Sequence, residues 1–317
     1  MKKYENRYKV EIAVSSVFLI MLTLFFITSP RVFLDYRIYM AIFTNLGVLI
    51  ILSVSNVFIV TAGEIDVSFP SMIGLGGWIF ASLSSLGLNL FLALLLALIV
   101  CSIAGLINGI LVVKLGLSSL ITTLGMLFLL RGVINIFLKG NFIILTFLKD
   151  TFFRNIFVGR IGVFPVSMLW GIFVAVLAWI FYYRHKFGGY ISFIGDNITA
   201  AKEMGINVEG VKIITFIIPA VAAGFSGFLL TMTNNFFTGT SGDGYLLIVL
   251  VAVFIGGTPT WGGVGTIFGA VVGAFIMGFI ESGIVAAGLT GFYTQFFFGL
   301  ILIIALIGHK FNGLEKK

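Results

Sequence analysis

Charged residues are scarce in this chain, and their scarcity excludes a water-soluble fold. Of its 317 residues only 10% are Asp, Glu, Lys or Arg, whereas a soluble domain carries about 25%. Hydrophobic residues make up 60%, and a domain surrounded by water cannot bury so much apolar surface. The sequence therefore describes an integral membrane protein and excludes a soluble enzyme.

Cysteine and histidine are nearly absent, which excludes several kinds of site. The single cysteine, Cys101, lies inside an apolar run, so no disulfide framework or cluster of metal thiolates can form. His185 and His309 have no cysteine or carboxylate at ligand spacing. The chain also lacks a Gly-x-x-x-x-Gly-Lys-Ser/Thr phosphate loop and a recognisable Ser–His–Asp arrangement. We expect no metal, no cofactor, no catalytic residues and no ATPase site.

Apolar runs of about 20 residues follow one another, and each is long enough to cross a hydrocarbon core as a helix. Runs such as Leu88–Val113 are apolar on every face, unlike the alternating strands of a transmembrane barrel. The first run lacks a small-x-small cleavage pattern, so we interpret it as a retained span. The predicted fold is all-α, with about ten transmembrane helices in a single domain, 1–317. The spans are predicted at 12–29, 38–62, 67–86, 88–113, 117–138, 163–183, 211–233, 245–257, 264–285 and 289–308.

The basic residues indicate how these spans are oriented. With both termini on one side, that side collects twelve of the 19 Lys and Arg residues, the other side six, and Arg131 lies within a span. The positive-inside rule then predicts cytoplasmic termini. Because the charges lie at span ends and not in a compact basic domain, the net charge of +7 reflects topology, and we expect no nucleic-acid partner.

Two spans are interrupted by polar and turn-forming residues. Glu64, Asp66 and Pro70 fall between apolar runs, and Asn235–Gly244 precedes a run of only about a dozen residues. Irregular backbone at membrane depth persists only where protein or water satisfies its polar groups. Paired interruptions in two halves of a transporter point to the substrate path. We therefore predict two inverted repeats, spans 2–5 and 7–10, with broken helices.

The longest cytoplasmic loop, 184–212, differs from the others. Asp196 or Asn197 can cap a short helix whose body includes residues 199–203, and Gly205 can end it. Such a helix is suited to contact another protein. The alternative interpretation is an ordinary solvated loop.

Four sequence blocks resemble the ribose-, xylose- and galactose-type permeases of bacterial ABC importers, within the branched-chain amino acid and sugar permease superfamily. Phe193–Val211 is similar to the cytoplasmic coupling loop of that family, and Gly63–Ser68 (GEIDVS) to its GGIDLS block. Gly105–Gly125, followed by Arg131-Gly132, and Gly256–Gly278 agree in order and spacing. Glu64 departs from the family's glycine, and the family's Tyr-Glu-Leu-Asp becomes a Tyr-Leu-Leu-Ile sequence that begins at Tyr245.

The resemblance implies a permease subunit that moves a monosaccharide or related sugar-containing solute across the bacterial inner membrane. It implies three partners: a second permease copy in a homodimer or heterodimer, a cytoplasmic ABC ATPase that binds the ATP, and an extracytoplasmic solute-binding protein. Within the coupling loop 184–212, the residues implied to contact the ATPase are Gly195, Asp196, Asn197, Ala200, Ala201, Lys202, Glu203, Gly205 and Ile206.

Polar residues within the spans are candidates for the translocation path, because amides, hydroxyls and aromatic rings hold sugars. The alternative is that the Asn and Thr residues only join neighbouring helices and that Asp66 caps the third span. Arg131 and Glu281 are hypothesised to form an ion pair. The path candidates are Asn45, Asn56, Asp66, Trp78, Asn108 and Thr123.

Other kinds of transporter stay open as alternatives. One is an ABC permease for nucleosides or branched-chain amino acids, although the Gly-x-Ile-Asp and Thr-Leu-Gly blocks argue against the latter. The other is an ion-coupled secondary transporter. Such proteins usually keep acidic or histidine relays at mid-membrane, and the spans of this chain hold almost none of these residues.

Overall fold

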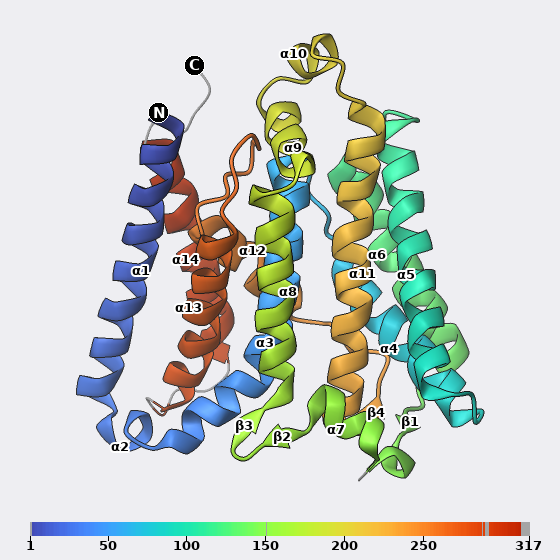
Figure 1. The fold of residues 1–317 in the computed structure, drawn as a ribbon. Helices are drawn as coiled ribbons and strands as arrows, with labels where there is room; N and C mark the ends of the chain where they lie inside the picture. Colours follow the sequence, from blue (N-terminus) through green and yellow to red (C-terminus); the bar gives the residue numbers. More distant parts are fainter. Residues whose placement is uncertain (1, 150, 287, 289–291, 312–317) are drawn as a thin grey trace.

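The protein is a bundle of helices that run between two ends (Figure 1). A computed structural model describes residues 2–149, 151–286, 288 and 292–311. Within this part of the chain, seven helices are long and apolar enough to cross a membrane, which confirms an all-α membrane protein. They are α1 (Lys2–Thr28), α3 (Tyr36–Thr61), α5 (Leu90–Val113), α6 (Ser119–Leu138), α8 (Val166–Tyr183), α11 (Val208–Asn234) and α13 (Ile267–Ala286).

Three further predicted spans contain helices that are shorter or less completely described. They are α4 (Phe69–Ser85), α12 (Tyr245–Ile255) and α14 (Phe292–Phe311). Each of the ten predicted spans thus contains a helix, and among the described residues seven helices meet the requirements for a full crossing. The count of ten spans stays a prediction.

The helix α3 forms the centre of the bundle. It packs against α8, α11, α12 and α13, and most of its residues are buried. Glycine allows close approach between helices, because a side chain at these points would collide with backbone. A Cβ on Gly76 of α4 would lie 2.5 Å from Gly224 Cα of α11, and one on Gly47 of α3 would lie 2.1 Å from Ser167 O at the start of α8. The α11 helix packs against α4 and α5.

The first helix lies at the edge of the bundle. Only 6% of its apolar window is buried, and its main partner is α13. Phe18 meets Phe275 and Phe279 edge to face, with ring centroids 5.8 and 5.5 Å apart. The short helix α2 (Pro30–Phe33) then turns the chain toward α3. Most of the surface of residues 11–28 of α1 therefore remains exposed and apolar, as expected of a helix in lipid.

The two ends of the bundle differ. The helices α9 (Lys186–Asp196) and α10 (Ile198–Glu203) lie at the end where α1 begins and α14 ends (Figure 1). The opposite end carries short elements: β1 (Ile143–Ile144), η1 (Thr146–Leu148), α7 (Phe152–Val158), β2 (Arg160–Ile161), β3 (Phe164–Pro165) and β4 (Phe236–Phe237).

Two short antiparallel pairs organise this opposite end. β1 pairs with β4, with Ile143 opposite Phe237, and β2 pairs with β3, with Ile161 opposite Phe164. The first pair ties the segment after α6 to the segment after α11. This pairing could not be predicted from the sequence, because two-residue strands carry no detectable periodicity.

Candidate functional site

The first broken helix is the junction between α3 and α4. After Thr61 the chain turns at Gly63, which has a φ of +82°, and returns into the bundle before α4 starts at Phe69. Side chains from two other helices hold this linker, residues 62–68. The Val67 N–H donates to Thr123 Oγ1 of α6 at 3.1 Å, and Asn108 Nδ2 of α5 donates to Ser68 Oγ at 2.9 Å.

Asp66 lies at the centre of this linker and is buried. Its Oδ1 accepts from the N–H of Ser68 at 2.7 Å and from the Ser68 hydroxyl at 2.6 Å. Ser68 occupies the N-cap position of α4, so Asp66 bonds the N-cap residue, and its role as the cap of this helix stays a prediction. Asp66 Oδ2 and Asn108 Oδ1 find no hydrogen-bond partner among the described residues.

Three of the predicted path candidates, Asp66, Asn108 and Thr123, thus meet at one point. All three are buried in protein. Asp66 and Thr123 accept from N–H groups of the linker, and Asn108 donates to the Ser68 hydroxyl. These contacts join neighbouring segments, and a role of the same residues in the path stays a prediction.

The other three candidates lie apart from this point. Asn56 is buried in α3 and donates to Leu52 O of its own helix at 2.8 Å. Trp78 packs on Phe137, with ring centroids 5.2 Å apart. Asn45 is exposed on α3.

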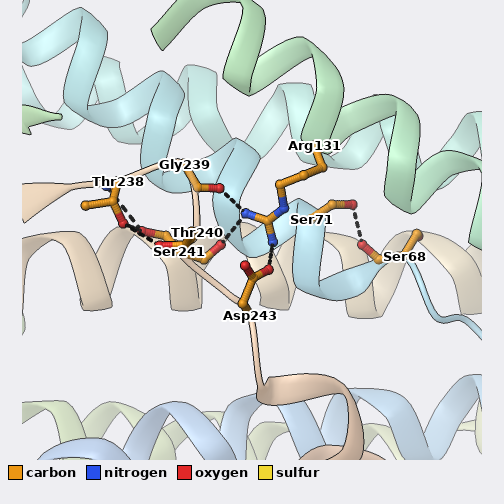
Figure 2. A network of polar contacts seen from close by, with 8 residues as sticks. All are labelled: Ser68, Ser71, Arg131, Thr238, Gly239, Thr240, Ser241 and Asp243. Atoms are coloured by element: carbon orange, nitrogen blue, oxygen red, sulfur yellow. Dashed lines mark hydrogen bonds and ion pairs between the residues drawn. The ribbon is translucent and has the colours of Figure 1, made fainter. Parts of the chain in front are cut away.

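The second broken helix is the junction between α11 and α12, and Arg131 of α6 holds it. Nη1 of Arg131 donates to the carbonyls of Gly239 and Ser241, the latter at 3.0 Å. Nη2 forms an ion pair with Asp243 at 2.5 Å. Figure 2 shows the guanidinium between these three acceptors. The hypothesis that Arg131 pairs with Glu281 was therefore wrong, because Asp243 is its partner.

The two linkers are in direct contact inside the bundle. A Cβ on Gly242, in the second linker, would lie 2.2 Å from Pro70 O in the first turn of α4. A Cβ on Gly74 would lie 3.1 Å from Ser241 O. Gly74 lies 11 residues before Ser85 at the end of α4, which is about 16 Å along the helix. The two breaks therefore meet well inside the thickness of the bundle.

The end that carries α9 and α10 contains the predicted coupling residues. α9 was predicted as part of a loop, but Phe187, Ile191 and Ile194 form a buried stripe at helical spacing. α10 agrees with the prediction: Asn197 accepts from the N–H groups of Thr199 and Ala200 at 3.0 and 3.1 Å.

The predicted coupling residues divide into buried and exposed groups. Gly205 follows α10 with a φ of +76°, the left-handed conformation that commonly ends helices. The buried members are Gly195, Ala201 and Ile206, and the exposed members are Asp196, Asn197, Ala200, Lys202, Glu203 and Gly205.

The end of α9 contacts the end of α3 and the segment after α12. A Cβ on Gly195 would lie 1.9 Å from Thr61 O and 2.4 Å from Gly263 N, and the Gly263 N–H donates to Thr61 O at 2.8 Å. Beside this contact Glu64 forms an ion pair with Lys212 of α11. Both side chains line a cavity of about 260 Å³ that also includes Gly195. This ion pair was not predicted from the sequence.

Apolar helices with two breaks that meet inside the bundle define a multi-pass membrane protein of the transporter class. The chain belongs to the family described as "Branched-chain amino acid transport system / permease component", whose sequence pattern matches residues 38–306. The protein is therefore a permease component.

Individual relatives cover most of the chain. The autoinducer 2 import system permease protein LsrC of Photorhabdus luminescens is 31% identical over 277 residues, which is 87% of this chain and 83% of the relative. The ribose import permease protein RbsC of Escherichia coli K12 is 30% identical over 260 residues, 81% of this chain and 80% of the relative. RbsC of Haemophilus influenzae is 29% identical over 267 residues, 84% of this chain and 83% of the relative. No solved structure matches the chain significantly.

Proposed function

We propose that this permease is the membrane subunit of an ATP-driven importer for a monosaccharide or related sugar-containing solute. The observation that carries the proposal is the meeting of two broken helices inside the bundle of a chain from a permease family. The family description names branched-chain amino acids, but the relatives reported above are named for ribose and autoinducer 2. Those names favour a sugar over an amino acid as the solute.

The proposed topology has ten spans in two inverted repeats, α3–α6 and α11–α14, with α1 and α8 outside them. The packing of α3 and α11, the first helix of each proposed repeat, supports this assignment. α3 packs against α12 and α13 of the other repeat, and α11 packs against α4 and α5. Each break also occupies the same position, after the first helix of its repeat.

The end with α9 and α10 is proposed to face the cytoplasm of a cell whose inner membrane holds the protein. An ABC ATPase on a separate chain binds ATP and docks there, a solute-binding protein delivers solute at the opposite end, and a second permease copy completes the path. Exposed side chains on α9, α10 and the turn that follows support a docking role, because apolar residues stand beside charged ones. They are Phe193, Ile198, Lys202, Glu203 and Met204.

The ion pair between Glu64 and Lys212 and the contacts of Gly195 support a coupling role for this end. They connect α9 and the start of α11 to the linker 62–68. A movement of α9 driven by the ATPase therefore displaces residues that lead directly into the first broken helix.

Purification of the tagged protein from its native membrane tests the partners, and the expected result is co-purification of an ABC ATPase. Deletion of residues 196–205 should then abolish ATP-dependent uptake while the protein still inserts. The paired charge reversal Lys202→Glu with Glu203→Lys should reduce uptake, whereas Arg160→Glu, an exposed charge at the opposite end, should leave ATPase docking intact. Repeated purification without an ATPase, or normal uptake after the deletion, contradicts the proposal.

A further inference from the structure

Asp243 is an exposed carboxylate at a depth well inside the ends of the bundle. Its side chain is 60% exposed, whereas that of its partner Arg131 is 16% exposed. Arg131 lies seven residues before Leu138 and twelve after Ser119 in α6, which is about 10 Å from one end of the helix and 18 Å from the other. The ion pair fixes Asp243 at the same depth.

The surrounding sequence makes this carboxylate unusual. Asp243 is the only charged residue between Lys212 and Glu281. A charged side chain facing lipid at this depth costs several kcal/mol, so ionisable residues within spans face protein or water. The linker backbone has the same requirement, because irregular backbone at membrane depth needs a protein or water environment. Lipid is therefore an unfavourable environment for the exposed side of Asp243, and a water-filled path is a favourable one.

The groups around Asp243 suit hydroxyl-bearing molecules. The N–H of Asp243 donates to Thr240 O at 3.0 Å, so both side chains leave the same turn. The hydroxyls of Thr238 and Thr240 lie 3.1 Å apart on the exposed side of the linker. The Arg131 side chain is mostly covered and directs donors to Gly239, Ser241 and Asp243 of its own chain (Figure 2).

We propose that Asp243 is a solute-contacting residue that selects neutral polyhydroxylated molecules over anions, and that Arg131 positions its carboxylate. This inference rests on the proposed function and assigns a residue of the same path. The carboxylate accepts hydrogen bonds from solute hydroxyls, and the threonine hydroxyls both donate and accept. A carboxylate or phosphate on the solute meets the negative charge of Asp243 before it can reach the covered guanidinium.

Thiol labelling measures both the water access and the charge of this position. Thr240→Cys, in the complete importer in membrane vesicles, is treated with a cationic and an anionic methanethiosulfonate of similar size, added from each side in turn. Native Cys101 provides the background, because it is fully buried. Leu129→Cys is the matched control: Leu129 is 58% exposed and lies two residues before Arg131, on the opposite face of α6.

The expected result is that Thr240→Cys reacts from at least one side and that Leu129→Cys does not. When each rate at Thr240→Cys is divided by the rate of the same reagent with a free thiol, the cationic reagent should react faster than the anionic one. Adding Asp243→Asn should lower the cation-to-anion rate ratio by at least about threefold, because one charge at close range is removed. Adding Arg131→Lys instead should keep the preference for the cationic reagent, because the Asp243 carboxylate and the positive charge at position 131 are both retained. Only the planar guanidinium that clamps the linker is lost.

Lack of reaction at Thr240→Cys from both sides, or a rate ratio unchanged by Asp243→Asn, overturns the inference. Co-purification of an ATPase from the same membranes separates this failure from failure of the proposed function. An ATPase with an unreactive Thr240→Cys refutes only the role of Asp243. A reactive cysteine with the expected charge preference but without an ATPase refutes only the importer assignment.

Discussion

Substitution of Gly195 by alanine tests the contact between α9, the end of α3 and the segment after α12. The added Cβ would lie 1.9 Å from Thr61 O and 2.4 Å from Gly263 N. Both are backbone atoms, so no side-chain rotation can relieve the collision. Either α9 moves away or the hydrogen bond from Gly263 N–H to Thr61 O is distorted.

Two opposing effects set the size of the change. Alanine is favoured over glycine within a helix by about 0.5–1 kcal/mol. Overpacking of a well-packed site costs about 1–3 kcal/mol, and distortion of the backbone hydrogen bond adds about 1 kcal/mol. We expect Gly195→Ala to lower the free energy of unfolding by about 1–3 kcal/mol.

Gly189→Ala is the matched control, because Gly189 lies in the same helix and a Cβ there would meet nothing within 4 Å. It should be neutral or stabilise by up to about 1 kcal/mol. Thermal and denaturant unfolding of the two purified variants in detergent measure the difference, and ATP-dependent uptake measures its effect on coupling. Equal stability of the two variants refutes the tight contact at Gly195.

Two further predictions concern the first linker. The side chains of Glu64 and Lys212 are 15% and 12% exposed. A double-mutant cycle with Glu64→Gln and Lys212→Met should therefore give a coupling energy of about 2 kcal/mol, which lies between the values for surface and for buried ion pairs. Additive effects of the two substitutions would contradict this ion pair. Thr123→Val leaves the buried Val67 N–H without its acceptor and should destabilise the protein by about 1–3 kcal/mol. Thr122→Val, on a neighbouring face of α6, should have a smaller effect in the same unfolding measurement.

The helices and their breaks could be predicted from the sequence because lipid restricts what the chain can do. A span must satisfy its own backbone hydrogen bonds, so each apolar run contains a helix, and the polar residues at 63–70 and 235–244 interrupt them. The cap at Asn197 and the end at Gly205 were predictable because both depend on local chemistry. The helix α9 was missed, although Phe187, Ile191 and Ile194 carried the helical spacing.

The contacts of the second linker could not be predicted, because Arg131 and Asp243 are 112 positions apart in the chain. Residue type alone does not show what a polar side chain contacts. Thr123 accepts from a linker N–H and Asn108 donates to the Ser68 hydroxyl inside the bundle, whereas Asp243 is exposed. One signal for these contacts was available in the sequence. Asp243 is a single charge in a long uncharged stretch, where an unpaired charge would be costly.

The helix α6 contacts both broken helices and so connects their positions. Thr123 accepts from the first linker, and Arg131 binds the second. Eight residues separate them, about 12 Å along one helix. The end of α3 contacts α9 through Thr61, and the first linker contacts α11 through Glu64. Under the proposed coupling role, a displacement at α9 meets the end of α3, then the first linker, then α6 and the turn that carries Asp243. The apolar window of α6 is only 22% buried, whereas that of α3 is 83% buried. A shift of α6 therefore breaks fewer packing contacts than a shift of α3. For this reason we expect the two breaks to move together through α6.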